Sequence, residues 1–149
     1  RIPGDVASHN PNVEGVREVM ARAIQAAADD LPFEGPYAFE LPEGTASETH
    51  HRVLTLLDDR AVPEPTDQTP VFKVAQVYLR GWYGQVDIIR PENPADGPAR
   101  SPNVEQVVTA KLRYEPFSGW RVRGLRLWRV PVHEALVLST RQAEQSVAE

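Results

Sequence analysis

The period of the apolar residues changes along the chain and divides the sequence into a helical part followed by a strand part. Between Val13 and Leu31, apolar residues recur at steps of three and four, which is typical of one face of an amphipathic helix. Asn10 is a suitable N-cap, Pro11 suits the first helical position, and Pro32 stops the pattern. We therefore expect a first helix between Pro11 and Leu31.

A second helix is predicted after a connection rich in proline and glycine, residues 31–44. Thr45 and Glu48 have the spacing of a capping box, in which the two side chains bond to free backbone N–H groups. The predicted apolar side that follows is formed by His50, Val53, Leu54 and Leu57. The proline-rich stretch from Val62 to Pro70 cannot continue a helix, so we expect this helix to end near Arg60.

The connection between the two predicted helices contains three aromatic residues. Tyr37, Phe39 and Leu41 alternate along it, as in a short edge strand. Exposing Phe33, Tyr37 and Phe39 together would be unfavourable, so we expect them to pack on the body of the domain. The simpler interpretation is a loop that covers one end of a sheet, and the alternative is a lid over a ligand pocket.

From Val71 onward the period is two, which indicates β-strands. The segments VFKVAQVYL and WYGQVDII are rich in β-branched and aromatic residues and flank a turn near Arg80 and Gly81. They predict a hairpin. A single long strand bent at Gly81 and Gly84 is the alternative, because glycine inside a strand often marks a bulge.

The strongest strand pattern, NVEQVVTAKLRY, follows a proline-dense connection from Pro91 to Pro102. The side predicted to be buried consists of Val104, Val108, Ala110, Leu112 and Tyr114. The side predicted to face solvent consists of Glu105, Thr109, Lys111 and Arg113. The residues EPFSG then turn the chain back into a last strand, so the two strands are expected to pair as a hairpin.

The last strand, GWRVRGLRLWRV, departs from regular alternation. Trp120 and Arg121 face opposite sides, and unbroken alternation would place Leu125 and Leu127 with Arg121, in solvent. A β-bulge at Gly124 would insert one residue and return both leucines to the Trp120 side. The solvent side would then combine Arg121, Arg123, Arg126 and Trp128 with Lys111 and Arg113 of the neighbouring strand.

The order of these elements predicts one α+β domain over residues 1–149. Two N-terminal helices precede an antiparallel meander of three to four strands, and the first helix packs on one face of the sheet. After the last strand, the segment PVHEALVLSTRQAEQSVAE has mixed character, and we expect a short strand or turn followed by a frayed helix. The order resembles that of the cystatin-like and nuclear-transport-factor-like rolls. That resemblance is one of element order alone and implies no catalytic residue.

Composition removes several classes of protein. The chain has 149 residues, 41% hydrophobic and 25% charged, which is typical of globular domains. It contains no cysteine, which excludes disulfides, thiol nucleophiles and thiolate metal sites. No apolar run approaches the ~20 residues of a membrane span. Because the chain begins at Arg1 without a signal-peptide pattern, we expect a trimmed or mature fragment, and its compartment stays open.

Few residues suggest catalysis. His50 and His51 are adjacent on a predicted helix and diverge by about 100°, so they do not chelate one ion, and we predict no metal and no cofactor. Asp87 is the acid to consider, because burial between bulky neighbours would raise its pKa, although a place on the solvent side is the simpler interpretation. Asp87, His50, Tyr37 and Phe39 are the pocket candidates of an alternative hypothesis, a small roll-type enzyme or ligand carrier.

Charge is distributed unevenly. The net charge is −5, yet the stretch from Lys111 to Arg129 holds six basic residues and one acidic residue, a local balance of +5. Such segregation favours an acidic partner or self-association, whereas the acidic total argues against a general nucleic-acid binder. Single-stranded nucleic acid remains a third hypothesis, since arginine contacts phosphates and tryptophan stacks on bases.

We therefore predict a non-catalytic binding domain. Its basic sheet face would meet an acidic protein or a second copy of the chain, with arginines steering the encounter and tryptophans supplying desolvated area. The candidate binding residues are Lys111, Arg113, Arg121, Arg123, Arg126, Trp128 and Trp82.

Overall fold

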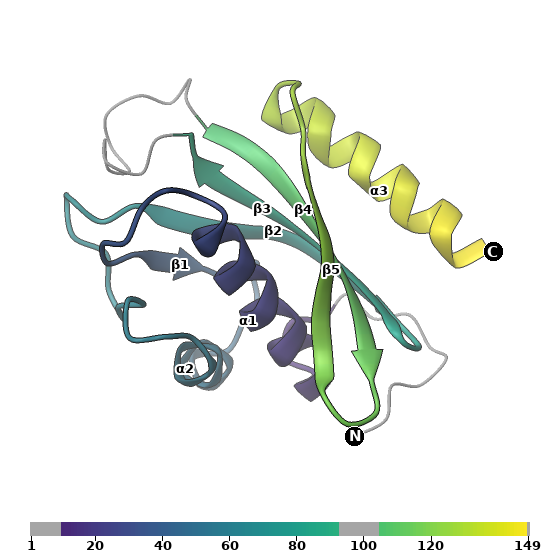
Figure 1. Cartoon of the computed structure of the whole chain (residues 1–149), viewed down its shortest axis with the longest axis horizontal. Helices are drawn as coiled ribbons and strands as arrows, with labels where there is room; N and C mark the ends of the chain where they lie inside the picture. The colour runs from purple at the N-terminus through teal and green to yellow at the C-terminus, as the bar shows by residue number, and fades with distance from the viewer. Residues whose placement is uncertain (1–9, 93–104, 149) are drawn as a thin grey trace.

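The structure, a computed structural model, describes residues 10–92 and 105–148 as three helices and a five-stranded sheet (Figure 1). The helices are α1 (Glu14–Asp29), α2 (Ser47–Leu56) and α3 (Val132–Ala148). The strands are β1 (Ala38–Glu40), β2 (Val71–Arg80), β3 (Tyr83–Pro91), β4 (Glu105–Glu115) and β5 (Gly119–Leu127). They follow one another in chain order across the sheet, with β1 parallel to β2 and all other pairs antiparallel. The predicted α+β class is confirmed.

α1 lies on one face of the sheet and forms the main core with it. Met20 and Ile24 are fully buried against this face, together with Val16 and Val19. The predicted amphipathic helix is confirmed, but it begins at Glu14 rather than at Pro11. The Asn10 side chain instead accepts a hydrogen bond from the Asn12 N–H at 2.9 Å, which forms a turn ahead of the helix.

α2 packs against α1 and begins without the predicted capping box. The hydroxyl of Thr45 donates to the carbonyl of Pro42, so it does not cap the helix. Asn12 instead contacts the start of the helix, because its Oδ1 accepts hydrogen bonds from the Ala46 N–H at 2.9 Å and the Thr49 hydroxyl at 2.7 Å. The start of α2 is thus held by a residue far away in sequence.

The edge strand predicted between the first two helices exists as β1. It pairs with β2 in parallel, with Phe39 beside Phe72. Tyr37 and Phe39 are buried, which confirms that the aromatic connection packs on the domain. The segment after α2 lies alongside the residue that precedes β1, because the Tyr37 N–H donates to the Arg60 carbonyl at 3.1 Å and the Val62 N–H donates to the Tyr37 carbonyl at 2.9 Å.

The predicted hairpin of β2 and β3 is confirmed, and the alternative of one bent strand is wrong. Arg80 pairs with Tyr83 across the turn, and Gly81 adopts a φ of 56° that favours glycine. β3 then pairs with β4 along its whole length. The predicted connection from Pro91 to Pro102 and the start of the next strand, Val104, lie largely outside the described residues.

The predicted bulge in the last strand is confirmed. Val122 pairs with Leu112, but Gly124 pairs with Lys111, so Arg123 is the inserted residue. Leu125 consequently returns to the side that faces α1 and packs at the margin of the core. The bulge therefore turns Leu125 inward and keeps Arg121 and Arg123 outside, but Leu127, which was also expected to turn inward, remains 39% exposed.

α3 covers the opposite face of the sheet, which the sequence did not predict (Figure 1). The tail forms a helix from Val132 onward, so the expected strand is wrong and the expected helix is longer. The side chains that α3 buries are small: Ala135, Ser139 and Ala143. Small side chains allow a close approach to the sheet but give a weak hydrophobic pattern. Among the helices of the described residues, none has the length and apolar character to cross a membrane.

Candidate functional site

α3 divides its face of the sheet into a covered polar half and an open basic half. In Figure 1 the yellow helix lies near the top and right of the sheet, whereas the β4–β5 turn lies at the bottom. We use "basic face" for the open half, whose cationic residues are Lys111, Arg113, Arg121, Arg123 and Arg126. All four arginines are exposed and the lysine is half-buried. Most of the predicted binding residues thus lie on one continuous surface of β4 and β5.

Asp87 lies in the covered half and is 2% exposed. Its carboxylate accepts hydrogen bonds of 2.5 Å from the hydroxyls of Thr109 and Ser139 and from Nε2 of Gln76. Burial raises the pKa of Asp87, and these three hydrogen bonds act in the opposite direction. The interpretation that placed Asp87 in solvent is wrong, because the tail folds over it, and Thr109 is buried for the same reason.

The neighbours of Asp87 are themselves hydrogen-bonded. Nε1 of Trp128 donates to the Thr109 hydroxyl at 2.7 Å. Nε2 of Gln85 donates to both the carbonyl and the hydroxyl of Ser139 at 3.0 Å. This network joins β2, β3, β4 and Trp128, directly after β5, to α3, and its carboxylate is almost completely buried. Its role is to attach α3 to the sheet through matched donors and acceptors.

The other pocket candidates do not meet Asp87. The ring of His50 stacks on Phe39 with a centroid distance of 4.5 Å, and Phe39 belongs to the core on the α1 side of the sheet. Asp87 belongs to the α3 side. Because Met20 and Ile24 fill the space between α1 and the sheet, the structure does not bring together the residues of a roll-type pocket.

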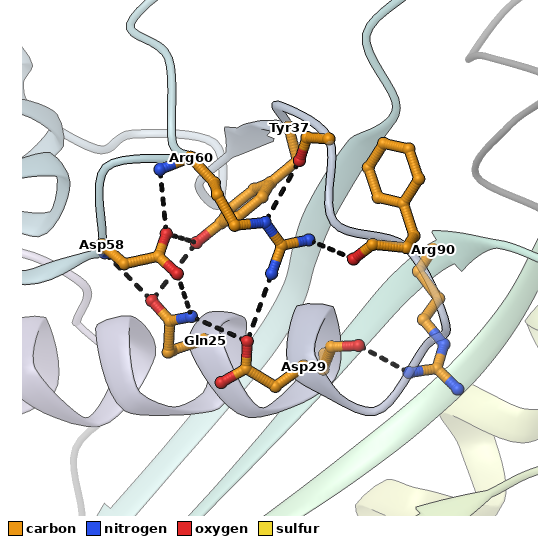
Figure 2. A network of polar contacts seen from close by, with 9 residues as sticks. Gln25, Asp29, Tyr37, Asp58, Arg60 and Arg90 are labelled. Atoms are coloured by element: carbon orange, nitrogen blue, oxygen red, sulfur yellow. Dashed lines mark hydrogen bonds and ion pairs between the residues drawn. The ribbon is translucent and has the colours of Figure 1, made fainter.

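A second polar network joins α1 to the segment that follows α2 (Figure 2). Nε2 of Gln25 donates to Asp29 at 3.0 Å and to Asp58 at 2.9 Å, while its Oε1 accepts from the Asp58 N–H at 3.0 Å. The phenol of Tyr37 lies at 3.4 Å from Gln25 Oε1. Burial, followed by the charge of Asp58, raises the pKa of Tyr37, so this phenol stays protonated.

Arg60 fixes the loop after α1 to this network. Its Nε donates to the Gly35 carbonyl at 3.1 Å, its Nη2 to the Phe33 carbonyl at 2.6 Å, and its Nη1 lies 3.3 Å from Asp29. Figure 2 shows the guanidinium between the helix and the loop, and it also lies 5.3 Å from the centroid of the Tyr37 ring. These contacts favour a loop that covers the domain over a loop that opens as a lid.

The cations of the basic face outnumber its carboxylate. Arg121 and Arg123 both lie near Glu115, at 3.6 Å and 3.2 Å between guanidinium and carboxylate, and remain 59% and 61% exposed. Arg113 pairs in register with Arg121. In the part of the chain that the structure describes, neither Arg113 nor Lys111 forms an ion pair. The face therefore keeps a net positive charge after its internal pairs are counted.

Trp128 is not an exposed anchor. It is 8% exposed, because α3 packs over it, and the Arg126 guanidinium lies 3.8 Å from the centroid of its ring. Arg126 thus shields the indole from solvent while keeping its own charge at the surface. The solvent position expected for Trp128 is wrong for the same reason as that of Asp87.

Trp82 is the exposed tryptophan of the site, with 42% of its side chain in solvent. The Tyr114 N–H donates to the Trp82 carbonyl at 2.8 Å, and the two rings lie 5.2 Å apart. A groove of 490 Å³ opens here, lined by Trp82, Arg113, Tyr114, Glu115, Pro116 and Arg123. Phe117, at the tip of the neighbouring turn, is fully exposed. Phe117 is not among the binding residues predicted from the sequence, although an aromatic residue inside a predicted turn is an available signal.

Comparisons with protein-family models, with curated proteins and with solved structures return no match to this chain. Within residues 10–92 and 105–148, no group of three His, Asp or Glu side chains is arranged to hold a metal ion. The interpretation of the site therefore depends on the geometry of the basic face itself.

Proposed function

We propose that the domain binds an acidic surface of a partner protein through the basic face. The main support is that α3 stops short of this half of the sheet, leaving five cationic side chains around one carboxylate in a protein of net charge −5. Arginine suits this role, because its planar guanidinium forms two parallel hydrogen bonds with a carboxylate. The acidic remainder of the chain would repel an acidic partner elsewhere, so the charge distribution also selects the binding side.

The margin of the basic face would supply the apolar part of such an interface. Trp82 is held beside Tyr114, and Phe117 projects from the next turn. Aromatic residues next to arginines are typical of the positions that contribute most to protein association. We assign steering to the arginines and desolvated contact area to Trp82 and Phe117.

We further infer that the domain is a variant of the cystatin-like roll, since a helix followed by an antiparallel meander is the shared element order. The parallel strand β1 and the covering helix α3 would be additions to that plan. This inference is independent of the proposed binding and lends it no support.

A charge-reversal experiment tests the proposal. We would compare the R121E/R123E variant with the matched R52E/R141E variant, which reverses two exposed arginines on α2 and α3. The probe is a fluorescein-labelled polyglutamate peptide, followed by anisotropy at low and physiological salt. We expect the wild type and R52E/R141E to bind alike and R121E/R123E to bind at least about tenfold more weakly. Equal binding by all three proteins would reject the basic face as the binding site.

Two further measurements separate the proposal from its alternatives. Light scattering of the unmixed protein detects self-association, and a dimer that R121E/R123E dissociates would identify a second copy, rather than an acidic partner, as the occupant. A labelled single-stranded oligothymidine measures nucleic-acid binding, which would fall steeply with salt. Tighter binding of this oligonucleotide than of polyglutamate would replace the protein partner with nucleic acid.

A further inference from the structure

The two edge strands of the sheet, β1 and β5, differ in the length of backbone that they offer for pairing. β1 has three residues, and Tyr37 just before it is bridged to Ala61, whereas β5 has nine residues. At β5, within residues 10–92 and 105–148, no strand pairs with the outer edge. An open edge presents backbone N–H and C=O groups to any extended chain that comes alongside. β5 is thus the side on which the sheet can accept a further strand.

One backbone group shows which residues of β5 point outward. The Trp120 N–H donates to Oε2 of Glu18 on α1, at 3.4 Å, which indicates that it points away from β4. Because backbone direction alternates along a strand, Val122 presents its N–H and C=O on the same outer side. The bulge at Arg123 ends the regular stretch, so the edge suited to pairing is residues 119–122.

A groove accompanies this stretch of β5. It has a volume of 470 Å³ and lies between α1 and the edge strand, lined by Arg22, Gln25, Ala26, Asp29, Ser118, Trp120, Arg121 and Val122. On the β5 side the groove is lined by Trp120 and Val122 together with Arg121, and α1 contributes polar side chains, including Arg22 and Asp29. Trp120 and Val122 pack toward the core, whereas Arg121 and Arg123 reach Glu115 on the opposite side of the strand. A strand placed beside β5 would therefore meet a different chemistry on each of its two faces.

We propose that the partner binds as an added strand on the β5 edge, and that its binding segment alternates acidic with small apolar residues. This inference rests on the proposed function and gives its mode of binding. Cross-strand neighbours interact side by side, so acidic residues would face Arg121 and Arg123 while apolar ones would lie beside Trp120 and Val122. Glu18 accepts the outward Trp120 N–H, so an added strand would replace this side-chain acceptor with a backbone carbonyl.

Arginines and bulges on an edge strand also have a protective explanation, since they discourage pairing between copies of a protein. If protection were the whole explanation, the affinity for an acidic peptide would not depend on the order of its residues. The experiment therefore compares two labelled peptides of the same composition, one alternating glutamate and valine and one with the glutamates and valines in separate blocks. We expect the alternating peptide to bind at least about tenfold more tightly, a difference of about 1.4 kcal/mol.

Backbone pairing is tested on the peptide, so that folding of the protein is never in question. One series carries N-methyl groups on the valine amides and the other on the glutamate amides. In an antiparallel addition, the peptide residues opposite Trp120 and Val122 direct their N–H groups to β5, and these residues are the valines. In a parallel addition, the peptide residues whose N–H groups bond to β5 are the glutamates. We expect one series to lose binding and the other to keep it.

The outcomes distinguish the two proposals. If the block peptide binds as tightly as the alternating one, or if both N-methylated series bind like the unmodified peptide, strand addition is rejected. The proposed function survives that result provided that R121E/R123E still weakens binding. If R121E/R123E binds every acidic peptide like the wild type, both proposals fail together.

Discussion

The hydroxyl of Ser139 in α3 donates a hydrogen bond to the carboxylate of Asp87 in β3 over 2.5 Å. The same hydroxyl accepts a hydrogen bond from Gln85 at 3.0 Å. This residue thus links the covering helix to two residues of one strand within the covered half of the face. The position of α3, and with it the extent of the open surface, depends on polar contacts that can be removed individually.

Replacing Ser139 with alanine should destabilise the domain by about 1–3 kcal/mol, because a buried carboxylate and a buried amide each lose a partner. The matched change, Ser118→Ala in the exposed β4–β5 turn, should alter stability by less than about 0.5 kcal/mol. Urea unfolding of both variants measures the difference. Equal stabilities would mean that the network does not attach α3.

The pH dependence of stability should report on Asp87. Burial raises its pKa above the ordinary 3.8, so the folded state favours the protonated carboxyl. A group with a raised folded pKa contributes stability that is fully present below its unfolded pKa and is lost as pH rises through its folded pKa. An Asp87→Asn variant cannot ionise at this position. We expect the wild type to lose stability relative to this variant as pH rises above the ordinary aspartate value, and the difference to become constant above the raised pKa.

Urea unfolding of the wild type and Asp87→Asn at matched pH values measures this effect, and taking the difference removes the contributions of other groups. A difference that does not vary with pH, or one that shifts in favour of the wild type as pH rises, would show that desolvation does not dominate at Asp87.

Replacing each of two glycines of β5 with alanine should affect the stability of the domain differently. Gly119 has a φ of 75°, and a β-carbon there would lie 3.2 Å from Oε1 of Glu18, so Gly119→Ala should cost about 1–2 kcal/mol. Gly124 lacks a positive φ, and a β-carbon there would meet no atom within 4 Å, so Gly124→Ala should change stability by less than about 0.5 kcal/mol. Thermal unfolding measures both. A large loss at Gly124 would show that the bulge requires glycine.

Alanine substitution of the two tryptophans predicted to bind should have different effects: one should mainly reduce stability, and the other should mainly reduce peptide binding. Trp128→Ala removes a buried ring and the donor to Thr109, and should destabilise the domain by about 3–5 kcal/mol. Trp82→Ala should leave stability within about 1 kcal/mol and weaken polyglutamate binding about tenfold. Urea unfolding and peptide anisotropy of the same two variants test this. Unchanged peptide binding by Trp82→Ala would remove this residue from the interface.

The helices and strands with large apolar side chains could be predicted from the sequence, because burial imposes their period. The stripe through Met20 and Ile24 located α1, and the bulge in β5 followed from the need to bury Leu125. The anchoring of the start of α2 could not be predicted, because Asn12 contacts Ala46 across 34 residues. Contacts between distant segments leave no local pattern in a sequence.

The main error concerned what covers the second face of the sheet. α3 buries Ala135, Ser139 and Ala143, whose small or polar side chains do not form a recognisable apolar stripe. Without that helix, Asp87 and Trp128 were placed in solvent. The cationic segment could be predicted from the sequence. The solvent exposure of each of its side chains could not, because it depends on where α3 ends.

The most direct measurement of the central claim is an NMR titration of the protein with the polyglutamate peptide, observed at the indole N–H signals of the tryptophans. If the basic face binds acidic segments, the Trp82 signal shifts and saturates together with the Arg113, Arg121 and Arg123 side-chain signals. The Trp128 signal stays in place, since this indole is buried and bonded to Thr109. Saturable shifts confined to α2 or β1, with Trp82 and the arginines unmoved, would contradict the proposed function.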